Sequence, residues 1–259
     1  MTLADARGVV LDLDGCVWNG REVTPGAREA IAAIRRSGRG VAFLTNNSRA
    51  TGRDIHGRLV ALGIEADPPC VLTPLEILGE FIRERYGPSR VLVIGAEEMA
   101  EVIRGAGHEV LPLDRYREAG VVVVGNDFDL TYARLTAAAR AVAGGAALVT
   151  PNVDPRLPIE GGEFLPGCGA IVEAVAVAGG RRPEIVGKPE PPLFRIALAR
   201  LGLSPGQAVM VGDSLQSDIR GARRVGMRTV LFAPDGPPAA EGPDLTVRSF
   251  AELRAALGL

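Results

Sequence analysis

Two aspartates, Asp12 and Asp14, directly follow the apolar run Val9-Val-Leu11 and precede Gly15. Glycine allows the chain to turn sharply at this point. In open α/β sheets ligands bind at the carboxyl ends of strands, which is where both carboxylates would lie. A lone Asp-x-Asp is more often a turn with solvated side chains, so the function of this pair depends on what gathers beside it.

A second acidic pair, Asp213 and Asp218, follows the apolar run Val209-Met-Val-Gly212. Asp218 would fall near the first turn of the next helix, where the helix dipole alone also favours an acid. Carboxylates about 4 Å apart repel by roughly 4 kcal/mol at an effective dielectric of 20. Four aspartates at neighbouring strand ends would therefore need a cation, and oxygen ligands without a nearby histidine or thiol favour Mg²⁺ over zinc.

Other polar residues at predicted strand ends match an anionic substrate. The segment Thr45-Asn-Asn-Ser-Arg49 offers a hydroxyl, amides and a guanidinium, and its backbone N–H groups could bind phosphate oxygens. Lys188 lies in Gly187-Lys-Pro189, and a lysine on such a turn is usually a solvated surface charge. Beside four aspartates and a phosphate it would instead balance charge.

Short apolar runs alternate with helical patterns along the chain, which predicts βαβ units and a doubly wound parallel α/β sheet. Helices are expected from Thr24-Pro25 to Gly38 and from about Thr51 to Gly63. The expected strands are Val9–Leu11, Val41–Leu44, Val91–Ile94, Val121–Val124, Ala146–Val149, Val209–Val211 and Thr229–Phe232.

The acidic pairs lie near the two ends of the chain, whereas the middle has no comparable cluster. We therefore expect a Rossmann-like core from residues 1–77 and 183–259, and an inserted, smaller α/β cap domain from residues 78–182. A single continuous large sheet is the alternative.

The composition is that of a globular protein: of 259 residues, 47% are hydrophobic and 23% are charged. The 29 basic residues are offset by 31 acidic ones, so the chain lacks the excess of positive charge that would indicate binding to nucleic acid. The chain shows no signal pattern and no apolar run long enough to span a membrane, so we expect a cytoplasmic protein without a membrane partner. Its three cysteines are scattered, although Cys16 and Cys168 lie close to motifs and a reactive thiol there stays open.

These motifs together resemble the haloacid dehalogenase (HAD) superfamily, specifically its nitrophenylphosphatase-like branch with a large α/β cap. Segments in the middle and the tail extend the resemblance to nearly the whole chain. The motifs, in order, are Asp12-Leu-Asp14-Gly-Cys-Val-Trp-Asn-Gly20, Thr45-Asn-Asn-Ser48, Gly187-Lys-Pro-Glu-Pro191 and Gly212-Asp-Ser-Leu-Gln-Ser-Asp218. The cap-like segments are Gly125-Asn-Asp-Phe-Asp-Leu-Thr-Tyr132, Pro151-Asn-Val-Asp154 and Pro166-Gly-Cys-Gly169.

The resemblance implies a Mg²⁺-dependent phosphatase that hydrolyses a small organic phosphomonoester. Asp12 would attack phosphorus to form an aspartyl phosphate, and Asp14 would act as general acid and then general base. Thr45 and the amide of Asn46 would hold phosphate oxygens, and Lys188 would neutralise charge.

The resemblance also implies the metal and substrate contacts. Mg²⁺ would be bound by Asp12, the carbonyl of Asp14, Asp213 and waters, while Asp218 would orient Lys188 or a metal-bound water. The caps of related enzymes often dimerise, so a homodimer through the cap stays open, and the oligomeric state does not follow from the sequence. The substrate contacts would come from Asn47 and Arg49 of the core and from Asn152, Asp154 and Arg156 of the cap.

Three other functions use residues of the same types. A phosphotransferase or mutase would use the same aspartyl phosphate, and a non-catalytic phospho-accepting domain would also gather aspartates, although Asp14 and the second domain argue against the latter. Dinucleotide binding at Gly167-Cys-Gly169 is rejected because no strand is expected before it and the third glycine is absent. His56 and His108 show no ligand spacing and are expected at the surface.

Overall fold

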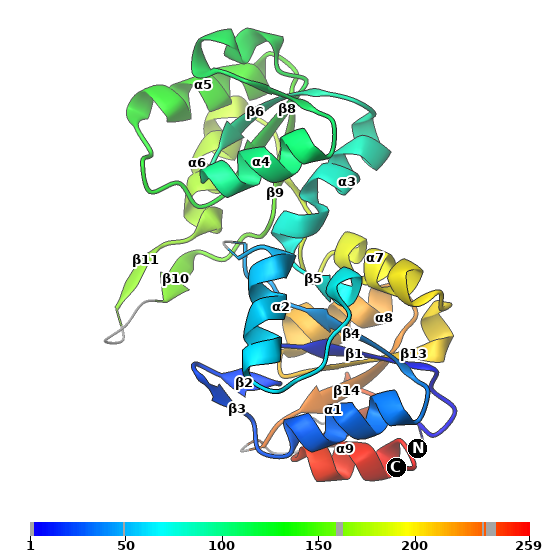
Figure 1. Ribbon diagram of the computed structural model, residues 1–259. Helices are drawn as coiled ribbons and strands as arrows, with labels where there is room; N and C mark the ends of the chain where they lie inside the picture. The colour runs from blue at the N-terminus through cyan, green and yellow to red at the C-terminus, as the bar shows by residue number, and fades with distance from the viewer. Residues whose placement is uncertain (1–2, 49, 159–162, 235, 237–241) are drawn as a thin grey trace. The chain divides into compact units, whose positions relative to one another are not determined.

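The computed structural model describes residues 3–48, 50–158, 163–234, 236 and 242–259. The chain forms two compact units. The first contains Met1–Thr45, Gly52–Thr73 and Lys188–Leu259, and the second contains Asn46–Thr51 and Pro74–Gly187. Each unit has its own main sheet of parallel strands with flanking helices (Figure 1). The predicted α/β class is confirmed, and the alternative of one continuous sheet is wrong. The expected limits of a catalytic core and a cap stay a prediction.

The first unit is built on a six-stranded parallel sheet with the order β15-β14-β13-β1-β4-β5. The central strand β1 pairs with β13 on one side and with β4 on the other. Every residue of β1 and β13 is buried, and Asp12 at the end of β1 is the only charged residue in either strand. The strands are β1 Gly8–Asp12, β4 Gly40–Leu44, β5 Val71–Leu72, β13 Ala208–Gly212, β14 Arg228–Phe232 and β15 Leu245–Val247.

Helices cover both faces of this sheet (Figure 1). The helices α1, Ala27–Arg36, and α9, Phe250–Ala256, pack together on one face, and α7, Pro191–Leu201, packs with α8, Arg220–Arg224, on the other. Helix α1 buries Ala27, Ala30, Ile31 and Ile34, a spacing that forms one apolar stripe. Helix α2, Gly52–Ala61, packs near β5. The two helices expected from their caps are therefore present as α1 and α2.

The second unit has a five-stranded parallel sheet with the order β12-β9-β8-β6-β7. Helices α5 and α6 pack over β6, β8 and β9 and form one apolar core with them, while α3 and α4 pack together. The strands are β6 Arg90–Ile94, β7 Glu109–Leu111, β8 Val121–Val124, β9 Ala147–Thr150 and β12 Glu184–Ile185. The helices are α3 Pro74–Tyr86, α4 Glu97–Gly105, α5 Tyr132–Ala143 and α6 Cys168–Gly179.

Two small hairpins complete the fold and correct one prediction. The hairpin β2, Trp18–Asn19, with β3, Glu22–Val23, belongs to the first unit, and β10, Arg156–Pro158, pairs antiparallel with β11, Phe164–Pro166, in the second. Strand β11 directly precedes Gly167, so the expectation that no strand precedes the glycine pair was wrong. It is an antiparallel hairpin strand, which is not the parallel strand of a dinucleotide-binding βαβ unit.

The expectation that His108 lies at the surface was also wrong. The side chain is buried, and its two ring nitrogens lie 3.0 Å from the carbonyl of Gly79 and 3.2 Å from the amide nitrogen of Ser89. These two backbone partners satisfy the polar atoms of the buried ring.

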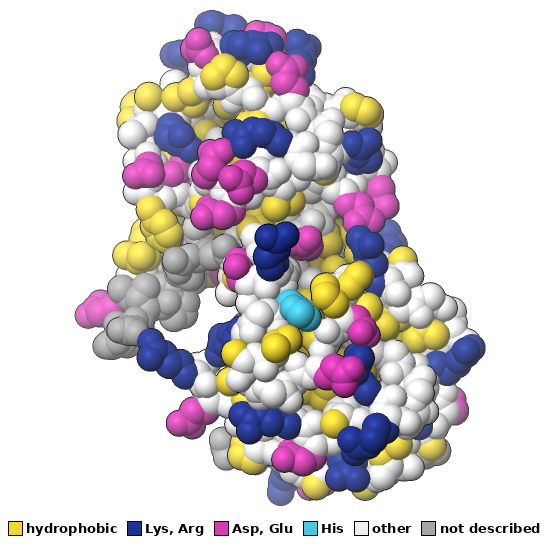
Figure 2. Space-filling model, in the orientation of Figure 1, with side chains coloured by type: hydrophobic (Ala, Val, Ile, Leu, Met, Phe, Trp, Pro, Cys, Tyr) yellow, Lys and Arg dark blue, Asp and Glu magenta, His cyan; other side chains and the backbone are white. Residues whose placement is uncertain are grey.

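No helix in the described part of the chain is long and apolar enough to cross a membrane. On the face drawn in Figure 2, basic and acidic side chains are mixed over the surface of each unit.

Candidate active site

The turn after β1 is set by Gly15. This residue has φ 86°, in the region that only glycine adopts readily, and its N–H donates to the carbonyl of Trp18 at 2.8 Å. A Cβ atom at this position would lie 2.2 Å from the Oδ2 atom of Asp213. Gly15 is therefore required twice, once by the backbone angle and once by the close approach of the carboxylate from the neighbouring strand end.

Lys188 joins two of the aspartates at the end of β1. Its Nζ atom donates to Oδ1 of Asp12 and, at 2.6 Å, to Oδ1 of Asp218. The three residues are 4%, 5% and 0% exposed, so these charges meet away from solvent. The other oxygen of Asp218 accepts a hydrogen bond from the N–H of Ser214 at 3.1 Å. Asp218 is thus held at both oxygens, and it fixes the lysine that reaches Asp12.

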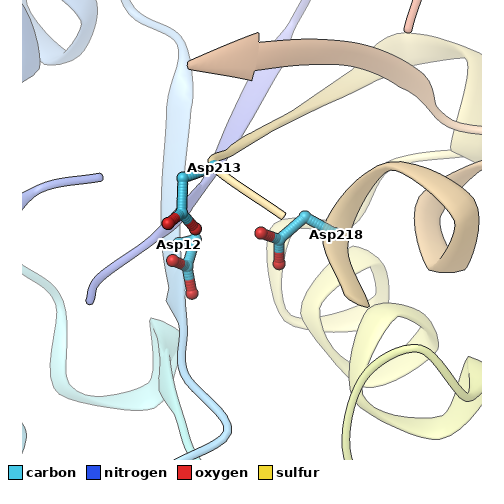
Figure 3. A group of neighbouring side chains, drawn as sticks. All are labelled: Asp12, Asp213 and Asp218. Atoms are coloured by element: carbon cyan, nitrogen blue, oxygen red, sulfur yellow. The ribbon is translucent and has the colours of Figure 1, made fainter. Parts of the chain in front are cut away.

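Asp213 completes a group of three carboxylates. Asp12, Asp213 and Asp218 each offer one oxygen, and these oxygens lie within 4.8 Å of one another. Figure 3 shows the three carboxylates turned toward each other. Asp12 ends β1, Asp213 directly follows β13, and Asp218 lies in the π-helical turn Leu215–Ile219. The adjacent parallel strands β1 and β13 therefore bring together residues about 200 positions apart.

The electrostatics of this group favour a bound cation. Burial, together with the carboxylates of Asp218 and Asp213, raises the pKa of Asp12 to about 8 against the opposing charge of Lys188. Loss of hydration and the charge of Asp218 also raise the pKa of Asp213. Burial alone would lower the pKa of Lys188, but the two carboxylates beside it raise it, so the lysine stays charged. Three clustered carboxylates and one ammonium leave surplus negative charge, and this all-oxygen donor set fits Mg²⁺.

The carboxylate of Asp14 lies next to this group and is held at both oxygens. Its Oδ1 accepts from the indole N–H of Trp18 at 2.8 Å, and its Oδ2 accepts from the hydroxyl of Thr45 at 3.1 Å. Thr45 directly follows β4, and its backbone N–H donates to the carbonyl of Leu72 at 3.2 Å. The first unit thus brings Asp14 and Thr45 together, as the strand-end argument predicted. Trp18 was not among the predicted site residues; its place four residues after Asp14, in the same motif, was the available signal.

The remaining candidate residues belong to the second unit. The carbonyl of Asn46 accepts from the side-chain amide of Asn152 at 2.9 Å, and the Oδ1 atom of Asn152 accepts from the N–H of Asp154 at 3.2 Å. The Oδ1 atom of Asn47 accepts from the N–H of Ala50 at 3.1 Å. Arg49 lies outside the described residues. Asn46, Asn152 and Asp154 are therefore linked by hydrogen bonds within this unit.

Two glycines hold the segment 152–156 against helix α6. A Cβ atom at Gly167 would lie 2.3 Å from the carbonyl of Asp154, and one at Gly169 would lie 2.2 Å from the carbonyl of Val153. The Gly-x-Gly pattern therefore serves close backbone packing. The side chain of Arg156 is exposed, and its guanidinium lies 4.3 Å from the ring centre of Phe164 on the paired strand.

Comparison with known proteins identifies the family. The model of the haloacid dehalogenase-like hydrolases matches residues 9–109, and a second HAD-hydrolase-like model matches residues 185–253. The sugar-phosphatase AraL of Bacillus subtilis is 31% identical, with 97% of this chain and 93% of the relative covered. The acid sugar phosphatase of Staphylococcus epidermidis is 34% identical, with 95% and 98% covered. The chain belongs to the haloacid dehalogenase-like hydrolase family.

A solved structure of the same family extends the similarity to the fold. The p-nitrophenyl phosphatase from Archaeoglobus fulgidus matches with a TM-score of 0.87 and 28% identity, covering 98% of this chain and all of that one. The chain is therefore an enzyme of this hydrolase family, with a HAD-type α/β fold.

The thiols near the motifs of this HAD hydrolase are buried. Cys16 is fully buried, and burial together with the charge of Asp12 raises its pKa well above the ordinary value. Cys168 is buried with its Sγ 3.3 Å from the hydroxyl oxygen of Ser48, and burial raises its pKa as well. Because the thiolate is the reactive form, both environments disfavour thiol chemistry at neutral pH.

Proposed function

We propose that this protein is a Mg²⁺-dependent phosphatase that uses Asp12 as a covalent nucleophile on a small organic phosphomonoester. The observation that carries the proposal is the lysine bridge at the end of β1, where Lys188 donates to both Asp12 and Asp218 while Asp213 lies within 4.8 Å. This arrangement holds one carboxylate at a strand end with counter-charge on one side, which suits attack on an anionic phosphate.

The reaction has two steps. An oxygen of Asp12 bonds to phosphorus while the bond to the alcohol or phenol oxygen breaks, and protonated Asp14 gives its proton to that leaving oxygen. Asp14, now ionised, takes a proton from a water molecule, whose oxygen bonds to phosphorus as the bond to Asp12 breaks. Orthophosphate leaves, Asp12 returns as a carboxylate, and Asp14 is again protonated.

The other residues bind the phosphoryl group and balance its charge. The hydroxyl of Thr45 and the amide of Asn46 would bind non-bridging oxygens, and Lys188 would offset the negative charge that Asp12 and the phosphate bring together. Mg²⁺, held by Asp12, Asp213 and the carbonyl of Asp14, would supply positive charge for the transferring phosphoryl group. Asp218 would keep Lys188 oriented.

The substrate class follows from the relatives and is part of the proposal. Phosphorylated sugars come first because two relatives are named sugar phosphatases, and aryl phosphates are included because a structural neighbour is named a p-nitrophenyl phosphatase. Glycerol phosphate, phosphoglycolate and nucleotides complete the set. We propose that the second unit selects among them, through Asn47, Arg49, Asn152, Asp154 and Arg156.

The test is phosphate release by the purified full chain. We expect turnover of p-nitrophenyl phosphate with Mg²⁺ and none with a chelator, and a panel of phosphomonoesters should then rank the substrates. Asp12→Asn protein from the same preparation controls for a contaminating phosphatase. Phosphate passed to an added alcohol instead of water would indicate a phosphotransferase, and stable labelling without turnover would indicate a phospho-accepting domain. Light scattering during gel filtration measures whether the chain is a monomer or a homodimer.

A further inference from the structure

Trp18 is hydrogen-bonded to Asp14 and to both chain neighbours of Asp14. It is 0% exposed, and its indole N–H donates to Oδ1 of Asp14 at 2.8 Å. Its backbone carbonyl accepts from Gly15 at 2.8 Å, and its backbone N–H donates to the carbonyl of Leu13 at 3.0 Å. The residues on both sides of Asp14 are therefore bonded to Trp18, and so is the Asp14 carboxylate.

The ring of Trp18 is also held by a contact with Arg58. The guanidinium carbon of Arg58 lies 4.0 Å from the ring centre, and the same guanidinium donates to the carbonyl of Gly20 in the β2–β3 hairpin. Within that hairpin Trp18 pairs with Val23. Because the cation covers the ring and the hairpin holds the backbone, the indole N–H has little freedom to turn away from Asp14.

We propose that Trp18 is a positioning residue that holds Asp14 ready to transfer its proton, and that Arg58 supports it. The proposal rests on the function of Asp14 given above. The Asp14 side chain is exposed, so without these contacts it would be free to rotate. An indole N–H can only donate, and a protonated oxygen is a poor acceptor. Trp18 therefore holds Oδ1 as an acceptor, and together with the hydroxyl of Thr45 at Oδ2 it fixes the plane of the carboxyl group.

A positioning role predicts a loss that depends on the leaving group. Alkyl phosphates need a proton on the departing oxygen, whereas p-nitrophenolate is stable enough to leave without one. Trp18→Phe keeps an aromatic ring for Arg58 but removes the N–H. We expect kcat/KM for glycerol phosphate to fall about 10- to 100-fold, and the ratio of alkyl to aryl kcat/KM to fall at least about tenfold.

Because Trp18 is the single tryptophan of the chain, the indole N–H can be replaced at this one position without changing the shape of the ring. Expression in a tryptophan auxotroph supplied with 3-benzothienylalanine replaces the indole N–H with sulfur at this one position and keeps the bicyclic ring. This protein should show the same drop in the alkyl-to-aryl ratio even if Trp18→Phe fails to fold. Arg58→Gln should shift the ratio in the same direction by a smaller factor.

The outcomes separate this inference from the proposed function. Equal losses on both substrates in the benzothienylalanine protein would mean that Trp18 only supports the fold, and no loss on either would mean that its N–H is irrelevant; each overturns the inference. Failure of the unmodified protein to hydrolyse either phosphate with Mg²⁺ would instead overturn the proposed function, and the inference with it.

Discussion

Each unit places a buried carboxylate at or just after the end of a central strand, but the negative charge of the two carboxylates is balanced differently. Beyond β8 of the second unit, Asp127 accepts from the Nε atom of Arg134 at 2.7 Å and from the N–H of Asp129 at 3.0 Å. At the end of β1 in the first unit, Asp12 shares the ammonium of Lys188 with Asp218, and Asp213 lies beside them. Asp127 therefore has a cation of its own, whereas Asp12, Asp213 and Asp218 are clustered near a single lysine ammonium.

This difference indicates which strand end favours binding of a cation. A buried carboxylate with a matched guanidinium is stabilised within the fold and has no electrostatic need for a ligand. A carboxylate whose pKa is raised to about 8 by burial and by its neighbours is held at a free-energy cost that a bound cation would offset. Strand ends of the same type can therefore be structural in one unit and reactive in the other.

The largest expected effect is the loss of turnover in Asp12→Asn, compared with Asp127→Asn. The first change removes the nucleophile but keeps a similar shape, so kcat should fall at least about a thousandfold while the circular dichroism spectrum is unchanged. The second leaves Arg134 without its carboxylate partner and should cost about 1–3 kcal/mol of stability, with kcat on p-nitrophenyl phosphate within about threefold of the parent. Comparable loss of kcat in both variants would remove the distinction between the two strand ends.

The metal requirement should respond only to the carboxylates that are clustered around Lys188. Asp213→Ala and Asp218→Ala remove, respectively, a proposed ligand and the partner that orients Lys188. We expect the Mg²⁺ concentration for half-maximal activity to rise about 10- to 100-fold. Asp5→Asn, which breaks an exposed ion pair with Arg228, is the control and should leave the titration unchanged. Unaltered curves for the first two variants would contradict their roles.

The pH dependence of Mg²⁺ binding tests the raised pKa of Asp12. Its pKa rises from the ordinary value of 3.8 to about 8, so without a cation the stabilising contribution of this group is present below pH 3.8 and is lost as the pH rises through 8. Mg²⁺ needs the ionised form, and its affinity should therefore increase by up to about tenfold per pH unit below pH 8. Isothermal titration calorimetry at pH 6, 7 and 8 measures this. Affinity that is flat with pH would mean that Asp12 is already ionised in the free enzyme.

The smallest effect is expected in the second unit, at Arg156. Arg156→Ala should raise KM for the preferred substrate about two- to tenfold, the size of one hydrogen bond, and leave kcat for p-nitrophenyl phosphate nearly intact. Arg182→Ala is the matched control, because that arginine is exposed in the same unit and pairs with Glu173. Equal loss on large and small substrates in Arg156→Ala would mean that its stacking on Phe164 supports the fold.

The parts of the fold that follow from local pattern could be predicted. Strands β1, β4 and β13 are apolar runs that end in polar residues, so both the sheet and the meeting of Asp12 with Asp213 could be expected from the sequence. Side-chain contacts away from the strand ends could not be predicted. The pairing of Ser48 with Cys168 spans 120 positions, and the burial of His108 depends on backbone groups of two other segments. Hydrophobic periodicity indicates which residues are buried but not which partner satisfies a polar atom.

The most direct test of the nucleophile is a rapid-quench experiment on the Asp14→Asn variant with p-nitrophenyl phosphate and Mg²⁺. The aryl leaving group needs no proton, so the first step should proceed, while loss of the general base should stall hydrolysis of the phosphoenzyme. We predict a burst of about one equivalent of p-nitrophenolate per chain and, in peptide mass spectrometry, a phosphate on Asp12 that is absent with chelator. A burst with the phosphate on any other residue, or steady turnover with no covalent phosphate, would contradict the role of Asp12.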